Sequence, residues 1–184
     1  MANFSKKQLR ENMISRRSNL PQNEVDRSSL QVASHLTQLL PLSSPRVIMA
    51  YYPLGKEIDL TFWLKQYQKQ GHTILLPRVE GKNLQAISFT GPENLIRSEF
   101  GVMEPEGLAY PLEQIEVVIV PGVAFDRNRY RLGFGQGYYD RFLPLLSPQT
   151  KLWGVAYHFQ IVENIGHEAH DWPLQKIITD QLVF

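Results

Sequence analysis

A glycine-rich stretch from Arg131 to Arg141 holds the residue types with the clearest chemistry in this sequence. It reads RLGFGQGYYDR, with glycine at every second position from Gly133 to Gly137 and one acid, Asp140. Glycine lets a backbone approach a ligand closely, and successive free N–H groups can surround phosphate oxygens. The arginines can neutralise an anion, and Asp140 can hold a metal ion. The stretch predicts a phosphate-binding loop, although a tight strand-to-helix turn has the same pattern.

The spacing of these glycines excludes the two common nucleotide-binding motifs. A dinucleotide fingerprint needs its third glycine where Tyr138 stands. A Walker loop needs lysine and then serine or threonine after its last glycine, but Tyr138 and Tyr139 follow Gly137. A phosphate bound here would be held in another geometry.

The C-terminal part offers candidate metal ligands. In the segment 167–170, His-Glu-Ala-His, the histidines are three apart and not four as in the zinc signature His-Glu-x-x-His, so zinc is disfavoured. Asp171 is better matched with Asp140, because carboxylates together with phosphates commonly hold Mg²⁺. The alternative is that Asp171 caps a loop before Pro173.

Near the N-terminus, Lys6 and Arg10 are four residues apart in a predicted helix over residues 4 to 18, which Ser5 can cap. The two cations would share a face, and a solvated basic face is the alternative to a binding role. Pro21 opens a second predicted helix that runs to about residue 40. We expect the helix pair, about 4–40, to pack on a sheet.

Hydrophobic periodicity predicts the elements that would position these side chains. We expect strands over residues 46–52, 73–76, 84–89, 115–120, 152–157 and 176–179, and further helices over 59–70 and 138–146. Pro144 should kink the second of these helices or end it early. The strand–helix–strand order at 46–76 implies parallel pairing, and ligands bind beyond the carboxyl ends of such strands. The glycine stretch follows the strand 115–120, which places it at that edge. The segment 91–112, rich in proline and glycine, is expected to be a long connection, and residues 100–105 within it can be a binding wall or a surface loop.

Composition bounds the class of protein. The chain has 184 residues, of which 43% are hydrophobic and 20% charged, with a net charge of +1. These values are typical of a soluble globular domain and give no sign of a nucleic-acid partner. No apolar run approaches the roughly 20 residues of a membrane helix, and a signal peptide is not expected. The absence of cysteine excludes disulfides and permits a cytoplasmic location. We expect one domain over 1–184.

The motifs together resemble the 5-formyltetrahydrofolate cyclo-ligase (5,10-methenyltetrahydrofolate synthetase) family. The resemblance rests on the run 121–126, Pro-Gly-Val-Ala-Phe-Asp, followed by the glycine stretch, and covers nearly the whole chain. Lys6-x-x-Leu9-Arg10, Glu57, the segment 100–105 and His170-Asp171 fall in the family's order. A departure is Gln136, where glycine or lysine is more usual.

The resemblance implies the activity and the site. It implies an ATP- and Mg²⁺-dependent ligase of one-carbon metabolism that converts 5-formyltetrahydrofolate to 5,10-methenyltetrahydrofolate. We expect the protein to be a cytoplasmic monomer or weak homodimer. The implied fold is an α/β three-layer α/β/α sandwich with a mostly parallel mixed sheet, similar to the phosphosugar-isomerase and CoA-transferase architecture. The implied ATP-binding residues are Lys6, Lys7, Gln8, Leu9, Arg10, Arg131, Leu132, Gly133, Phe134, Gly135, Gln136, Gly137, Tyr138 and Tyr139. Folate would be bordered by Tyr52, Glu57 and the turn from Phe134 to Tyr138. Arg131 and Asp140 would act in catalysis, and Asp140 and Asp171 would hold the metal.

Two other functions stay open from the residues alone. One is a non-catalytic module that binds ATP or another anion without turnover. The other is a phosphosugar isomerase of similar fold, which would need no ATP and for which Glu57 is the one candidate base. Tyr138 and Tyr139 can each stack on a pterin or pack the start of the helix.

Overall fold

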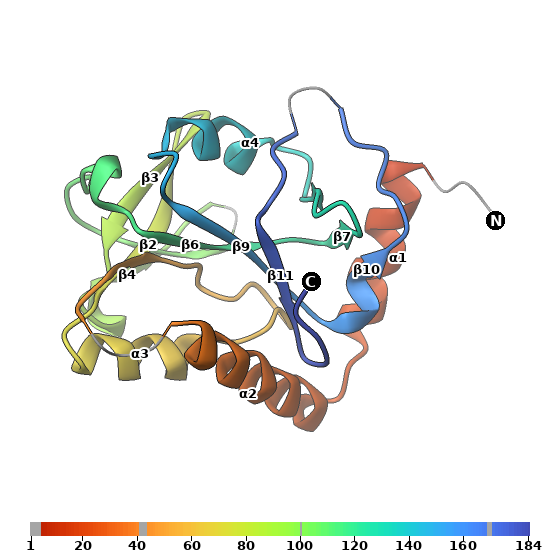
Figure 1. The fold of residues 1–184 in the computed structure, drawn as a ribbon, viewed down its shortest axis with the longest axis horizontal. Coiled ribbons are helices and arrows are strands. Elements are labelled where there is room, and N and C mark those ends of the chain that lie inside the picture. The colour runs from red at the N-terminus through yellow and green to blue at the C-terminus, as the bar shows by residue number, and fades with distance from the viewer. Residues whose placement is uncertain (1–4, 41–43, 100, 169–170) are drawn as a thin grey trace.

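A six-stranded sheet forms the centre of the computed structural model, which describes residues 5–40, 44–99, 101–168 and 171–184 (Figure 1). Its strand order is β11-β9-β6-β1-β2-β3. The strands are β1 (Val47–Met49), β2 (Thr73–Glu80), β3 (Asn83–Ser88), β6 (Val117–Pro121), β9 (Lys151–Ala156) and β11 (Lys176–Thr179). All neighbouring pairs are parallel except β2 with β3, which form a hairpin. The predicted mostly parallel mixed sheet is confirmed.

Helices cover both faces of this sheet. Figure 1 shows α2 (Gln22–Leu39) and α3 (Thr61–Lys69) on one face and α4 (Tyr138–Phe142) on the other. Val32 and Leu36 of α2 are fully buried in the apolar core on the first face, where each contributes about 1.5–3 kcal/mol by leaving water. A second core, which includes Phe142, fills the opposite face. The predicted three-layer α/β/α arrangement is confirmed, while the likeness to the phosphosugar-isomerase and CoA-transferase architecture stays a prediction.

Helix α1 (Lys6–Ser18) packs away from the six-stranded sheet. It starts at Lys6, because Ser5 and Gln8 form a reciprocal capping box. Leu9 and Met13 pack on a small cluster of buried residues. That cluster belongs to a second sheet of β7 (Ala124–Asp126), β8 (Arg131–Leu132) and β10 (Ile161–Val162) with its flanking residues. The two N-terminal helices therefore cover different sheets and do not lie together on one.

Strand β2 runs past Pro77, where the sequence predicted an end. Ala50 N–H donates to the Leu75 carbonyl, so Leu75 faces β1, and residue 77 faces the same side by alternation. Strand β1 has ended by that point. The missing N–H of Pro77 thus costs no ladder hydrogen bond, and β2 continues through its antiparallel pairing with β3.

The segment 91–112 is also more ordered than predicted. It contains the strands β4 (Leu95–Arg97) and β5 (Met103–Pro105), which pair antiparallel, and the 3₁₀ turns Pro92–Asn94 and Leu112–Gln114. The helix predicted over 138–146 ends early, as Pro144 within it predicted. It ends at Phe142 and continues as the 3₁₀ turn Leu143–Leu145, because Pro144 cannot donate a helical hydrogen bond. A further 3₁₀ turn spans His158–Gln160. In the described part of the chain, no helix is long and apolar enough to cross a membrane.

Candidate active site

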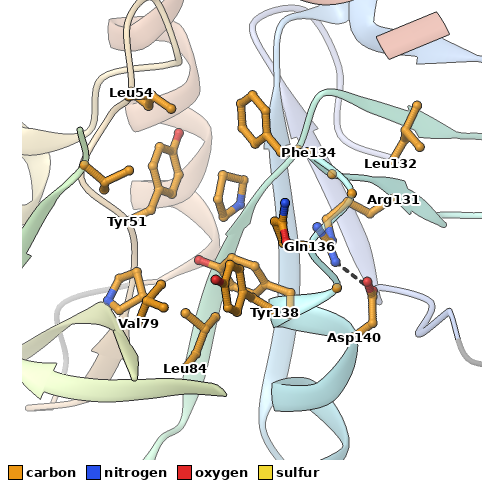
Figure 2. Close-up of a pocket in the computed structure, with 18 of the residues that line it drawn as sticks. Tyr51, Leu54, Val79, Leu84, Arg131, Leu132, Phe134, Gln136, Tyr138 and Asp140 are labelled. Atoms are coloured by element: carbon orange, nitrogen blue, oxygen red, sulfur yellow. Dashed lines mark hydrogen bonds and ion pairs between the residues drawn. The ribbon is translucent and has the colours of Figure 1, made fainter. Parts of the chain in front are cut away.

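A cavity of about 540 Å³ lies where the strands β1 and β6 end, beside the part of β2 that runs on past β1. This is the edge of a parallel sheet at which ligands are expected. Figure 2 shows Tyr51, Leu54, Val79 and Leu84 on one side of the cavity and Phe134, Gln136, Arg131 and Asp140 on the other, with Tyr138 between them. One wall is therefore apolar and aromatic, and the other is the glycine stretch.

The glycine loop has a shape that needs its glycines. Gly135 and Gly137 have φ of 100° and 67°, which side chains rarely adopt. A Cβ on Gly133 would lie 2.6 Å from Nη1 of Arg131. Gly137 is the residue before α4, whose five residues give only a short helix. The loop backbone and the surrounding cations, more than the helix dipole, thus form the anion-attracting wall.

Three cations converge on this wall. Arg131 donates from Nη2 to Oδ1 of Asp140 at 2.7 Å, and the Arg131 side chain is 7% exposed. Arg10 donates from Nε to the Gly133 carbonyl at 2.8 Å, which ties α1 to the loop. Nζ of Lys6 is 2.8 Å from Glu168 and 3.6 Å from Asp171. The solvated basic face considered for Lys6 and Arg10 does not describe these contacts.

The charge state of Lys6 is set by its acidic neighbours. Burial lowers the pKa of the Lys6 amine, but the hydrogen bond to Glu168 and the charges of Asp171 and Glu168 outweigh burial and raise this pKa above its usual value. Lys6 is therefore held as a cation at the cavity edge, where it can attract phosphate oxygens.

The carboxylates Asp140 and Asp171 both line the cavity. Each is bound or adjacent to a cation, Arg131 for Asp140 and Lys6 for Asp171. No group of three or more His, Cys, Asp or Glu side chains suited to a metal ion occurs among the described residues. Mg²⁺ usually takes one or two carboxylates and completes its octahedron with phosphates and water. The two carboxylates fit that donor set, provided that a ligand supplies phosphate oxygens.

A buried ion pair forms part of the apolar, aromatic wall. Oε1 of Glu57 accepts from Nη1 of Arg17 at 3.2 Å, and Oε2 accepts from the Leu54 backbone N–H at 3.0 Å. Both side chains of the pair are 7% exposed. Burial raises the pKa of the Glu57 carboxyl, while Arg17 and the Leu54 N–H oppose that rise. Arg17 had no role in the sequence prediction, because only the fold brings α1 to the loop after β1.

The paired tyrosines of the motif both line the cavity. The Arg131 guanidinium lies 5.2 Å from the ring centre of Tyr139, and that of Arg141 lies 5.4 Å from the ring centre of Tyr138. The Tyr139 hydroxyl is buried without a hydrogen-bond partner in the described part of the chain. Its burial raises the pKa of Tyr139 despite the charge of Arg131, so it stays a neutral hydrogen-bonding group. Which ring contacts a pterin stays a prediction.

The structure brings most of the predicted site residues together. The cavity lining includes Lys6, Arg10, Tyr52, Glu57, the residues 131–140 and Asp171. Three predicted ATP-binding residues are not part of that lining. Lys7 is exposed, Gln8 caps α1, and Leu9 packs on the small cluster under α1.

Other lining residues were not named as site residues from the sequence, namely Tyr51, Leu54, Pro77, Val79, Leu84, Val102, Glu104, Pro121, Gly122 and Glu168. Five of them stand in segments that the sequence had marked, 100–105, 121–126 and 167–170. The sequence offered one signal for Pro77 and Pro121, because each stands at the end of a predicted strand, where a parallel sheet is expected to bind ligands. The ring of His167 stacks on Tyr130 with 3.8 Å between ring centres. His170, part of the candidate zinc pattern and of the family motif, lies outside the described residues.

This chain is similar to known proteins over nearly its whole length. Residues 2–180 match the model of the 5-formyltetrahydrofolate cyclo-ligase family. A 5-formyltetrahydrofolate cyclo-ligase of Mycolicibacterium smegmatis is 29% identical, with 97% of this chain and 95% of that protein covered. The solved 5,10-methenyltetrahydrofolate synthetase of Aquifex aeolicus superposes with a TM-score of 0.83 at 38% identity, covering 97% of this chain and 91% of the other. That of Mycoplasma pneumoniae gives 0.82 at 25% identity and covers 97% and 100%.

Proposed function

This chain belongs to the 5-formyltetrahydrofolate cyclo-ligase family, and from that premise we propose that it closes 5-formyltetrahydrofolate to 5,10-methenyltetrahydrofolate in a reaction driven by ATP. The observation that carries the proposal is that one cavity has two different walls, the glycine loop with its cations and an apolar, aromatic surface. The glycine loop with its cations suits a triphosphate, and the apolar, aromatic wall suits a flat heterocycle.

The proposed chemistry solves a leaving-group problem. The formyl oxygen of a formamide is a poor leaving group, and the N10 amine of the folate cannot expel it unaided. Transfer of the γ-phosphoryl group from ATP to that oxygen releases ADP and gives a phosphorylated intermediate. The N10 lone pair then forms the bond to the formyl carbon, the C–O bond breaks with loss of phosphate, and N10 loses its proton.

Phosphoryl transfer depends mainly on positioning and on neutralising charge, and the glycine loop with its cations would supply both. Arg131, Lys6 and the loop N–H groups would bind the phosphates, and Arg10 holds the loop through the Gly133 carbonyl. When phosphates arrive, they would compete with Asp140 for Arg131 and with Glu168 for Lys6. Asp140 and Asp171 are the carboxylates that would then hold Mg²⁺, which supplies further neutralisation of phosphate charge.

The folate would bind against the apolar, aromatic wall. Tyr51, Tyr52 and Leu54 follow β1 and give it an apolar and aromatic surface. Glu57 is held there as one member of a buried ion pair. The proposal needs no nucleophilic side chain, since the nucleophile is N10 of the substrate itself.

The test is a coupled measurement on purified protein with 5-formyltetrahydrofolate, ATP and Mg²⁺. We expect the near-ultraviolet absorbance of the methenyl product to rise together with ADP, and neither to rise when the folate is left out. ADP release without product, or folded protein that yields no product, would contradict the proposal. An ATP-binding module would bind without turnover, and an isomerase would act without ATP.

The expected monomer or weak homodimer is checked by light scattering during size-exclusion chromatography, and the cytoplasmic location stays a prediction.

A further inference from the structure

Glu104 is a buried carboxylate that lines the cavity and has no role in the chemistry above. It belongs to β5, is 7% exposed, and stands in a segment that the sequence left open as a binding wall or a surface loop. Strand β5 packs against β2, which supplies Pro77 and Val79 to the same cavity. The Glu104 carboxyl is therefore part of the apolar wall, far from the aqueous setting that a carboxylate normally requires.

The charge of Glu104 is met by hydrogen bonds but by no ion pair among the described residues. None of them forms an ion pair with it within 4 Å, whereas Glu57 on the same wall is paired with Arg17. The nearby Arg78 directs its hydrogen bonds elsewhere, to the Gly107 carbonyl and to Gln85. Burial raises the pKa of the Glu104 carboxyl, and the Val79 backbone N–H, the Ser98 hydroxyl and the charge of Arg78 offset only part of that rise. A buried acid of this kind in a cavity is a mark of ligand recognition.

We propose that Glu104 recognises the pterin end of the folate, its two oxygens accepting hydrogen bonds from the N3–H and 2-amino groups. This inference rests on the proposed function and extends it to a specific binding residue. A 2-amino-4-oxopterin presents those two donors side by side on one edge, which matches the two oxygens of a carboxylate. Charge-assisted bonds of this kind are the strong ones in a dry site.

Polarity along the cavity favours the pterin over the adenine of ATP as the partner. Lys6 and Arg131 line the cavity on the side of the glycine loop, where the proposed function puts the triphosphate. An adenine edge alternates its single amino donor with the acceptors N1 and N7, which a carboxylate would repel. A pterin edge meets both carboxylate oxygens with donors. Binding in this orientation brings the N5-formyl group toward the glycine loop, since the donor edge and N5 lie at different ends of the ring system.

The test compares Glu104→Gln with the control Glu106→Gln, an exposed glutamate two residues further along. Glutamine keeps the shape but loses one acceptor and turns an amide donor toward the ligand. We expect the KM for 5-formyltetrahydrofolate and its Kd in the absence of ATP to rise about 10- to 100-fold in Glu104→Gln. The KM for ATP and the melting temperature should stay near those of the wild type, because no buried ion pair of the described residues is broken. Glu106→Gln should change none of these values.

A substrate analogue separates contact from a structural effect. A 5-formyltetrahydrofolate lacking the 2-amino group should bind the wild type weakly and Glu104→Gln almost equally weakly, so that the two losses do not add. Additive losses, an unchanged folate Kd, a selective rise in the KM for ATP, or parallel loss of melting temperature and of both KM values would each overturn the assignment. The Kd is measured without ATP, so a folate-specific loss would support Glu104 recognition even if the wild type showed no turnover.

Discussion

Asp140 shows how one side chain serves both the structure of the cavity and the proposed reaction. It accepts from Arg131 at 2.7 Å, and Arg131 is nearly buried. Without Asp140 the Arg131 charge would lack its partner and would be free to repel a metal ion from the same place. The carboxylate therefore balances the loop before a phosphate binds, and its proposed metal role begins only when phosphate takes over Arg131.

For Asp140→Asn we expect turnover dependent on Mg²⁺ to fall by about 100-fold or more, because charge stabilisation at the transferring phosphoryl group is lost. The melting temperature should fall less, since the amide oxygen can still accept from Arg131. Steady-state rates and thermal unfolding measure the two effects. Glu163→Gln serves as a control, because Glu163 pairs with Arg127 on the exposed surface. An active Asp140→Asn would remove Asp140 from the site.

The Arg17–Glu57 pair predicts a dependence of stability on pH. Burial already raises the pKa of Glu57, and the loss of Arg17 in Arg17→Met should raise it further. A carboxyl whose folded pKa lies above its unfolded value near 4.5 stabilises the fold below that value and loses this contribution as the pH rises. The cost of Arg17→Met should thus be about 3–5 kcal/mol near neutral pH and shrink in acid.

Thermal and denaturant unfolding across pH 4 to 8 measures this cost, in the wild type and in the variants. The double variant Arg17→Met/Glu57→Gln should recover much of the stability, because it leaves no unpaired buried charge. Arg17→Lys should lose less than Arg17→Met. A cost that does not change with pH, or a double variant as unstable as the single, would contradict the ion-pair argument.

At the scale of elements, α1 is a polar helix that joins three loops of the site. Lys6, Arg10 and Arg17 are spaced by four and seven residues, so they lie on one side of the helix. They contact Glu168, the Gly133 carbonyl and Glu57 in turn. The apolar support of α1 is small, since only Leu9 and Met13 pack on the cluster beneath it. Its position therefore depends strongly on the side chains that also line the cavity.

The glycine loop makes a prediction at the same scale. Gly135 has φ of 100°, and a Cβ there would lie 3.5 Å from the Arg10 guanidinium. Gly135→Ala should therefore lower stability by about 1–3 kcal/mol and also raise the KM for ATP, because the strained loop is the proposed phosphate site. Gly71→Ala is matched, with φ of 89° and open space around its Cβ. It should lower the melting temperature without changing the KM, and equal effects on KM would contradict the loop assignment.

At the scale of the whole molecule, sheet topology decides which segments meet. Strand β1 pairs with both β2 and β6, so the segments that follow β1 and β6 and the second half of β2 converge on one cavity although they are far apart in sequence. The strand β9 and then β11 extend the sheet on the other side of β6. In the second sheet β10-β7-β8, strand β8 leads directly into the glycine loop, and α1 packs on the buried residues of this sheet. The two proposed binding walls are thus products of the parallel order.

The sequence by itself determined the features that depend on neighbours along the chain. Periodicity identified α2 and the buried strand β6, Ser5 marked the start of α1, and alternating glycines identified the loop. These are set by local propensity, by burial of a repeating face and by backbone freedom. The resemblance of motifs also named the family that the comparison then showed.

Only the tertiary structure decided the contacts between distant segments. Three features depend on which strands lie side by side. They are the ion pair of Arg17 with Glu57, the packing of α1 on the second sheet, and the burial of Glu104 in the cavity wall. The passage of β2 through Pro77 depends on where its neighbour β1 ends. Residues far apart in the chain meet through the sheet order, and no local pattern encodes the electrostatic partner or the depth of burial that such a meeting creates.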